Sequence, residues 1–304
     1  MGLFHCPMGA PFYDDDACID CGLCSATTRE EMVAASSKIR AYLRSHPARQ
    51  GAVSKIAVAG KGGTGKSTIV ALMANALVRD GYSVLVLDAD ESNPGLHRLL
   101  GFSKEPIPLM ALLERFSSGE PGHGTEWLKR EQIAGGDIPS EYILDENGLR
   151  FLMVGKIVDP FQGCACSMAD VTRDFVAKLA LKDKELILID MEAGVESFGR
   201  GMERSVDTVL VVVEPSFESL ALAEKVSYMA EGMGIQRVRA ILNKVPSEEV
   251  RQKMLDELNK RNIKIIGTIF FDRALFEAGF EGKPPGDSKA AEDMKMFTRQ
   301  LLDK

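Results

Sequence analysis

The sequence predicts an α/β fold in which a mostly parallel sheet is flanked by helices. From Val53 onward, short β-branched runs alternate with helical patterns, and several of these runs are apolar throughout. Apolar strands of this kind are covered by helices on both faces, and alternating strands and helices build a parallel sheet. A phosphate-binding loop directly after the first run indicates a P-loop nucleoside triphosphatase.

The expected strands are the runs at 55–59, 83–87, 150–154, 185–189, 208–213, 238–242 and 264–269. A helix is expected over 69–78, directly after the phosphate loop. Shorter helical pieces are expected at 109–116 and 126–131, inside a Gly- and Pro-rich interval from Pro106 to Asn147. We interpret this interval as a connecting excursion near the active face of the sheet.

Composition excludes several classes of function. The chain has 304 residues, and 37 lysines and arginines against 44 aspartates and glutamates give a formal net charge of −7. This acidic balance argues against a dedicated nucleic-acid-binding protein, which needs a clustered basic surface. No apolar run approaches the ~20 residues that span a bilayer, and the first residues lack the basic start and apolar stretch of a signal peptide. We therefore expect a cytoplasmic protein with no membrane partner.

Two regions are expected: a Cys-rich extension with one helix at residues 1–50, and an ATPase domain at residues 51–304. Thr28 and Glu31 have the spacing of a capping box at the start of that helix. The apolar residues that follow share one helical face: Met32, Ala35, Ile39, Tyr42 and Leu43. The helix should end near His46, because Pro47 disfavours the helical conformation of the residue before it.

The phosphate loop is the segment Gly60-Lys61-Gly62-Gly63-Thr64-Gly65-Lys66-Ser67-Thr68. It has the strand–loop–helix context that this motif requires. The glycines let backbone N–H groups converge on the phosphates, and the helix N-terminus adds the positive end of its dipole. Lys66 is expected to reach the β- and γ-phosphates, and the Ser67 hydroxyl to bind Mg²⁺. The loop therefore predicts a nucleotide and magnesium site.

A second lysine, Lys61, follows the first glycine of this loop. The resulting K-G-G-T-G-K-S-T pattern resembles the deviant Walker A loop of the MinD, ParA and nitrogenase iron protein class of ATPases. In that class the early lysine contacts the nucleotide bound to a partner subunit. The resemblance implies that ATP assembles a homodimer, in which Lys61 supplies charge to the transition state in trans. A solvated lysine is the alternative.

Carboxylates end two of the expected strands, at the edge where an α/β sheet exposes its ligand site. Asp190 ends a Walker-B-like strand and is expected at the magnesium, and Gly194 in the switch loop that follows can present its N–H to the γ-phosphate. The resemblance implies that Asp90 orients or activates the attacking water and that Asp88 supports the magnesium shell. Each carboxylate alone is also explained as a helix cap.

Asn243 and Lys244 follow a later strand, at the position where members of the class hold adenine through the Asn amide. The resemblance therefore implies that this pair belongs to the nucleotide site.

Cys164 and Cys166 are separated by one residue, so both sulfurs can point to one side of a loop. They supply two thiolates, whereas a closed metal site has four ligands. A twofold axis through a dimer would bring the other two, so that one metal ion or cluster bridges the subunits. The alternative is a pair of buried thiols without a metal.

This Cys pair makes the resemblance more specific within the MinD, ParA and nitrogenase iron protein class. Together with the phosphate loop, residues 163–166, 190–196 and 198–201 look like segments of the CooC-type ATPases, which mature nickel enzymes of the carbon monoxide dehydrogenase/acetyl-CoA synthase group. The similarity covers about Val53 to the C-terminus. It implies a metallochaperone that holds Ni²⁺ or Zn²⁺ through Cys164 and Cys166 at the dimer interface and inserts nickel into such a client, at the expense of ATP.

The extension departs from the simplest members of that family, which begin near the phosphate loop. Cys18-x2-Cys21-x2-Cys24 matches the first three ligands of a bacterial ferredoxin run, but Thr28 stands at the fourth position. Cys6 is followed by a proline, as in ferredoxin runs, and can supply the fourth thiolate. We expect one [4Fe–4S] cluster here, with a zinc site or no metal as the alternatives.

The extension keeps two other functions open. One is an ATP-gated iron–sulfur electron donor that resembles the nitrogenase iron protein, and the other is an iron–sulfur cluster carrier. An electron donor of the first kind holds its two ligand cysteines far apart in sequence. Cys164 and Cys166 are separated by a single residue, which favours the nickel family.

Overall fold

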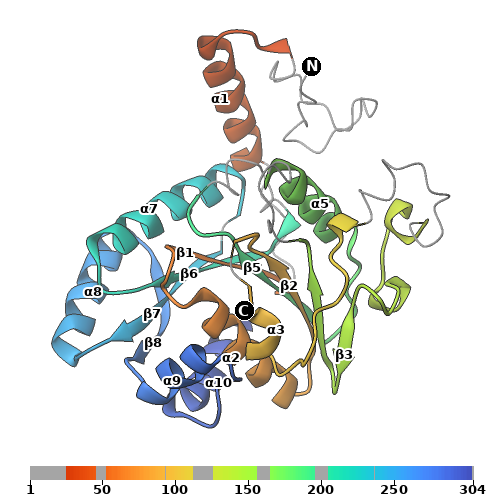
Figure 1. Cartoon of the computed structure of the whole chain (residues 1–304). Coiled ribbons are helices and arrows are strands. Elements are labelled where there is room, and N and C mark those ends of the chain that lie inside the picture. The colour runs from red at the N-terminus through yellow and green to blue at the C-terminus, as the bar shows by residue number, and fades with distance from the viewer. Residues whose placement is uncertain are drawn as a thin grey trace.

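The computed structural model describes residues 25–45, 53–92, 94–111, 126–155, 165–195, 205–235 and 237–302. In this part of the chain, an 8-stranded sheet has helices on both faces (Figure 1). This confirms the predicted fold class. Among the described helices, none is both long and apolar enough to cross a membrane.

The strands are β1 (Lys55–Gly60), β2 (Ser83–Ala89), β3 (Leu144–Glu146), β4 (Leu149–Met153), β5 (Glu185–Met191), β6 (Thr208–Val213), β7 (Val238–Val245) and β8 (Lys264–Phe270). Their order across the sheet is β3-β4-β2-β5-β1-β6-β7-β8. All neighbours pair in parallel except β3 and β4, which are antiparallel. Each expected strand is present, and β4 begins one residue earlier than expected.

The short strand β3 was not expected. It pairs with β4 through a hairpin at Asn147 and Gly148, which both have positive φ, 53° and 86°. An Asn-Gly dipeptide is a strong signal for a two-residue hairpin turn, because both central residues must adopt a left-handed conformation. The sequence contained this signal, but β3 is only three residues long and gives no periodicity of its own.

The α-helices are α1 (Arg29–Ser45), α2 (Lys66–Arg79), α3 (Leu96–Leu99), α5 (Ala165–Lys178), α7 (Phe217–Gly232), α8 (Glu248–Lys260), α9 (Arg273–Glu281) and α10 (Lys289–Leu302). Two short 3-10 helices, η3 (Glu126–Lys129) and η4 (Gly135–Asp137), lie between β2 and β3 in the chain. Helices α2 and α10 pack together on one face of the sheet, and α5, α7 and α8 cover the other.

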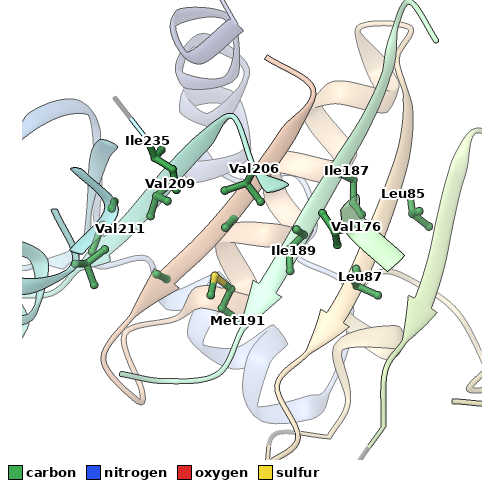
Figure 2. Packing of buried hydrophobic residues seen from close by; sticks show 14 of the residues in the cluster. Leu85, Leu87, Val176, Ile187, Ile189, Met191, Val206, Val209, Val211 and Ile235 are labelled. Carbon is green, nitrogen blue, oxygen red and sulfur yellow. The ribbon is translucent and has the colours of Figure 1, made fainter. Parts of the chain in front are cut away.

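Side chains of the central strands alternate between the two faces. In β5, Leu186 and Leu188 belong to the core under α2 and α10, whereas Ile187 and Ile189 belong to the core under α5 and α7. Figure 2 shows the second of these cores: Val176 of α5 lies beside side chains of β2 and β5, and Val209 of β6 lies beside Ile235. Both faces of each strand are buried, which explains why the runs are apolar without alternation.

The interval from Pro106 to Asn147 is divided between two places. Leu109 donates a backbone hydrogen bond to Met153 at the end of β4, so the start of the interval lies at the carboxyl edge of the sheet. Farther along, the ring of Trp127 meets Phe175 of α5 edge-on, at a centroid distance of 6.3 Å. The expected helical piece at 126–131 is η3, and most of the piece expected at 109–116 lies outside the described residues.

Helix α1 begins as the sequence predicted. The backbone N–H of Glu31 donates to Thr28 Oγ1 at 3.2 Å, and the N–H of Thr28 donates to Glu31 Oε2 at 3.0 Å, which is a complete capping box. Ala35 and Ile39 are buried, and α1 contacts α7 while its first turns extend away from the sheet (Figure 1).

The contact between β8 and α10 gives a test of the packing. A Cβ added at Gly267 would lie 2.4 Å from the ring of Phe297. We expect Gly267→Ala to lower the free energy of unfolding by about 1–3 kcal/mol in urea titrations, because α10 would have to move off the sheet. The matched control is Gly286→Ala, whose added Cβ meets nothing within 4 Å. Equal effects of the two substitutions would contradict this packing.

Candidate nucleotide site

The carboxyl ends of β1, β2, β5, β6 and β7 meet at one edge of the sheet and carry the predicted site. The strand register sets the neighbours: Gly60 lies opposite Val212 of β6, and Asp88 lies opposite Asp190 of β5. Because these strands are parallel and adjacent, residues far apart in the sequence must come together at this edge.

The phosphate loop turns tightly at its first glycine. Gly60 has a φ of 155°, and a Cβ there would lie 2.7 Å from the carbonyl oxygen of Val212. The loop is closed by Thr64, whose hydroxyl donates to the carbonyl of Lys61 at 2.9 Å. Gly65 precedes α2 in the left-handed region, with a φ of 91° and no side-chain cap. The first N–H groups of α2 therefore face the loop, as an anion site needs.

The buried lysine and hydroxyl of the loop stand beside the carboxylates. Lys66 is 6% exposed. Ser67 Oγ donates to Asp190 Oδ2 at 2.6 Å. Burial, followed by the nearby charge of Asp88, raises the pKa of Asp190 to about 7, although the Ser67 hydrogen bond and the charge of Lys66 act in the opposite direction.

This carboxylate pair fits a magnesium ion. The other oxygen of Asp190, Oδ1, is buried and accepts no hydrogen bond from the described residues. Asp88 is also buried, at 2% exposure. A hard divalent cation takes oxygen ligands of this kind, and it would satisfy the unpaired oxygen and offset the repulsion between the two carboxylates. Ser67, Asp88 and Asp190 are therefore the residues suited to hold Mg²⁺.

Asp90 is held in a turn at the end of β2. Its Oδ1 accepts from the backbone N–H of Ser92 at 2.9 Å and from the Ser92 hydroxyl at 2.7 Å. The side chain is 3% exposed. In this conformation the carboxylate organises its own loop, and contact with an attacking water requires Oδ2 or a rearrangement of Ser92.

Gly194 is also engaged with the loop. Its N–H donates to the carbonyl of Gly60 at 3.3 Å, and its φ is 105°. To present this N–H to a γ-phosphate, as the sequence analysis expects, the switch segment must first leave Gly60.

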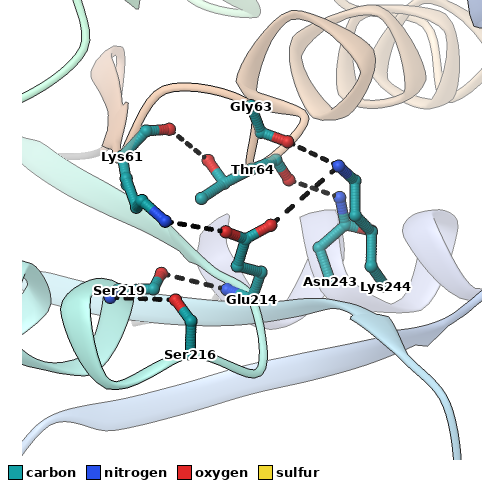
Figure 3. Close-up of polar contacts among 8 residues, drawn as sticks. All are labelled: Lys61, Gly63, Thr64, Glu214, Ser216, Ser219, Asn243 and Lys244. Atoms are coloured by element: carbon teal, nitrogen blue, oxygen red, sulfur yellow. Dashed lines mark hydrogen bonds and ion pairs between the residues drawn. The ribbon is translucent and has the colours of Figure 1, made fainter.

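Asn243 and Lys244 both contact the phosphate loop. Asn243 Nδ2 donates to the carbonyl of Thr64 at 2.7 Å, and Lys244 Nζ donates to the carbonyl of Gly63 (Figure 3). Because this contact uses the amide nitrogen of Asn243, the amide oxygen is the atom that would face a base. This oxygen can accept a hydrogen bond from the exocyclic amine of adenine, whereas guanine carries an acceptor at the same ring position.

Two cavities flank the loop and share Gly65, Thr68, Gly279 and Phe280 in their linings. The larger, of about 590 Å³, runs along the loop to α3 and the end of α9. The smaller, of about 270 Å³, lies beside Asn243 and is lined by Phe271 and Phe276, which are 58% and 62% exposed. Exposed aromatic rings of this kind offer stacking surfaces to a planar base.

Sequence reasoning missed these two phenylalanines. The signal was present in the segment F-F-D-R-A-L-F, which begins at the last residue of β8. Within this segment Asp272 caps α9 by accepting from the N–H of Ala274 at 2.8 Å. None of the described residues of α9 is buried.

Comparison with known proteins places the fold in a family. Residues 55–285 match the model of the CobQ/CobB/MinD/ParA nucleotide-binding domain. The chain belongs to this family. It is 36% identical to an uncharacterised ATP-binding protein of Methanocaldococcus jannaschii over 235 residues, which are 75% of this chain and 92% of that protein. It is 35% identical to the carbon monoxide dehydrogenase accessory protein CooC of Rhodospirillum rubrum over 235 residues, which are 75% of this chain and 88% of that protein.

Solved structures show the same fold. The septum site-determining protein MinD of Pyrococcus horikoshii, in complex with Mg-ADP, superposes with a TM-score of 0.60 and 20% identity, over 82% of this chain and 95% of that one. A ParA-family ATPase of Chlorobium tepidum superposes with a TM-score of 0.60 and 18% identity, over 82% and 98% of the two chains. Taken with the family match, this identifies the chain as a nucleotide-binding ATPase of the MinD/ParA type.

The cysteines fall outside what the structure describes. Cys6, Cys18, Cys21 and Cys24 precede the first described residue, and Cys164 directly precedes α5. Cys166 lies in the first turn of α5, with its side chain outside the described part. Among the described residues, no group of three or more His, Cys, Asp or Glu side chains could hold a metal ion by its own geometry. The magnesium site proposed above has two carboxylates and a hydroxyl, and a bound nucleotide supplies phosphate oxygens to such a site.

Substitution of Asp190 tests the carboxylate pair. We expect Asp190→Asn to raise the free energy of unfolding by roughly 1–3 kcal/mol at pH 8 in EDTA, because a buried charge next to Asp88 is removed. The folded-state pKa of about 7 lies above the ordinary 3.8, so the destabilisation by this carboxylate grows as the pH rises from about 4 to 7 and is complete above that range. The gain should therefore be smaller at pH 5.

The same variant should lose Mg²⁺-dependent ATP hydrolysis, which a phosphate-release assay measures. A variant that is less stable than the wild type at pH 8, or that hydrolyses ATP normally, would contradict the assignment.

Proposed function

We propose that this ATPase is a metallochaperone that inserts nickel into an enzyme of the carbon monoxide dehydrogenase/acetyl-CoA synthase type. The observation that carries the proposal is the 35% identity to a carbon monoxide dehydrogenase accessory protein along 88% of that protein's length. The Cys164–Cys166 pair supplies the chemistry, because thiolates are suitable ligands for Ni²⁺ and Zn²⁺.

In this proposal the nickel ion is the cargo, and two chains carry it between them. One chain offers two thiolates, from Cys164 and Cys166, and a twofold-symmetric dimer offers four. Helix α5 begins at Ala165, between the two cysteines. Through this helix the pair is connected to the core that lies under α5 and α7. A change in how the ATPase domains of the two chains pack against each other would then alter the metal site.

ATP controls the assembly of this dimer. Lys66 and the N–H groups at the start of α2 bind the phosphates, and Lys61 reaches the nucleotide of the partner. Ser67, Asp88 and Asp190 would hold Mg²⁺, which would offset the charge of the phosphates. Asp90 orients the attacking water, and Gly194 leaves Gly60 to bind the γ-phosphate, so that hydrolysis releases the switch segment.

The extension at residues 1–50 gives a second candidate function. Its two Cys-x2-Cys spacings and Cys6 support a [4Fe–4S] cluster, and a chain with a resident cluster can serve as an ATP-gated electron donor or as a cluster carrier. Within the nickel proposal, the cluster would serve redox sensing, client docking or reduction of the client site.

Metal counting on the full chain separates these functions. The variant Cys6→Ser/Cys18→Ser/Cys21→Ser/Cys24→Ser retains Cys164 and Cys166 as its only cysteines. Loaded anaerobically with nickel in the presence of a non-hydrolysable ATP analogue, it should bind about one nickel per two chains, with no acid-labile sulfide. Adding Cys164→Ser and Cys166→Ser should remove this nickel.

A retained iron–sulfur cluster that does not exchange for nickel would support the electron donor or the carrier instead. Nickel binding that survives the loss of Cys164 and Cys166 would contradict the proposed site.

The role of Lys61 is tested by hydrolysis. We expect Lys61→Ala to lower kcat for ATP by about 10²-fold or more, because a positioned charge is lost from the transition state. Binding of ADP to the single chain should change little, since in this proposal Lys61 acts on the nucleotide of the partner. Isothermal titration with ADP and a phosphate-release assay measure the two effects. A similar loss of ADP affinity would indicate that Lys61 contacts the nucleotide bound to its own chain, and would contradict a role in trans.

A further inference from the structure

Glu214 is a carboxylate that neither the sequence motifs nor the nucleotide chemistry uses, yet it stands at the centre of the loop contacts. It follows β6 directly, and β6 lies between β1, which leads to Lys61, and β7, which carries Lys244. The parallel register therefore brings three residues from three neighbouring strand ends together. Figure 3 shows the Glu214 carboxylate between the two lysines.

The contacts are unequal. Lys61 Nζ donates to Glu214 Oε1 at 3.4 Å, whereas Lys244 Nζ lies 4.0 Å from Oε2 and also donates to the carbonyl of Gly63. Glu214 is the one partner found for the Lys61 ammonium within the described part of the chain. Loss of the carboxylate charge would thus affect Lys61 most.

Glu214 itself is well anchored. Its backbone N–H donates to the hydroxyl of Ser219, which is 1% exposed, and its carbonyl accepts from the N–H of Ser216, the N-cap of α7. The Glu214 side chain is 21% exposed and that of Lys61 is 41% exposed. The backbone of Glu214 is therefore held in place, and its side chain is less exposed than that of Lys61.

We propose that Glu214 is a positioning residue, which holds Lys61 on its own phosphate loop until a nucleotide-loaded partner takes this lysine. The inference rests on the proposed function, in which Lys61 acts in trans. A partly exposed ion pair is weak, so a bound nucleotide with several negative charges can compete for Lys61. The contact then sets how readily the chains assemble around ATP.

The experiment uses the full chain and the isosteric variant Glu214→Gln, which keeps the shape and removes the charge. The matched control is Glu218→Gln, the same change at an exposed position in the first turn of α7. Thermal unfolding first establishes that both variants fold. Acetylation of the nucleotide-free chain is then followed by mass spectrometry at Lys61, and dimer formation with an ATP analogue is followed by sedimentation.

We expect Glu214→Gln to raise the acetylation rate of Lys61 about two- to fivefold and to lower the dimer dissociation constant by a similar factor. Glu218→Gln should match the wild type in both. In a Lys61→Ala background, Glu214→Gln should no longer change dimer formation, which a merely structural role of Glu214 would not produce.

Equal acetylation of Lys61 in Glu214→Gln and the wild type would overturn the inference and leave the proposed dimer intact. A shift in dimer formation that persists without Lys61 would overturn it as well. If the wild type does not dimerise with the analogue, the trans role of Lys61 fails, and with it the inference that Glu214 holds this lysine for a partner.

Discussion

The register between β2 and β5 is the constraint on which the site depends. It places Asp88 opposite Asp190 at the carboxyl edge of the sheet, with both carboxylates buried. Such a pair is unfavourable by itself, as the raised pKa of Asp190 indicates. The apolar cores on both faces of the sheet hold these strands in register, so their packing offsets the local repulsion. A site held in this way is suited to a divalent cation and its phosphate ligands.

The same edge also explains why the loop contacts connect so many elements. Because β1, β6 and β7 end side by side, Lys61, Glu214 and Lys244 are neighbours although the sequence separates them widely. In this conformation Gly194 is bonded to the first glycine of the loop, and Lys61 is paired within its own chain. In the proposed dimer, binding of nucleotide and of a partner exchanges both contacts, and this exchange couples the phosphates to the relative placement of the two chains.

Much of the fold could be predicted from the sequence, because buried parallel strands read as apolar runs and the phosphate loop has a fixed spacing. The hairpin strand β3 could not be predicted, because it is too short to show periodicity. The place of Phe271 and Phe276 in the lining of the smaller cavity could not be predicted either, because it depends on the distance between β8 and the phosphate loop. Glu214 was missed for a related reason: a single glutamate after a strand has no motif, and its role depends on which strands are neighbours.

In the proposed function, ATP hydrolysis delivers a metal ion held by Cys164 and Cys166. The most direct test is the activation of a nickel-free carbon monoxide dehydrogenase by the full chain loaded with one equivalent of nickel, measured as the rate of carbon monoxide oxidation. We predict activation that requires hydrolysable ATP and is lost in the Cys164→Ser/Cys166→Ser variant. Equal activation by that variant, or by the wild type without ATP, would contradict it.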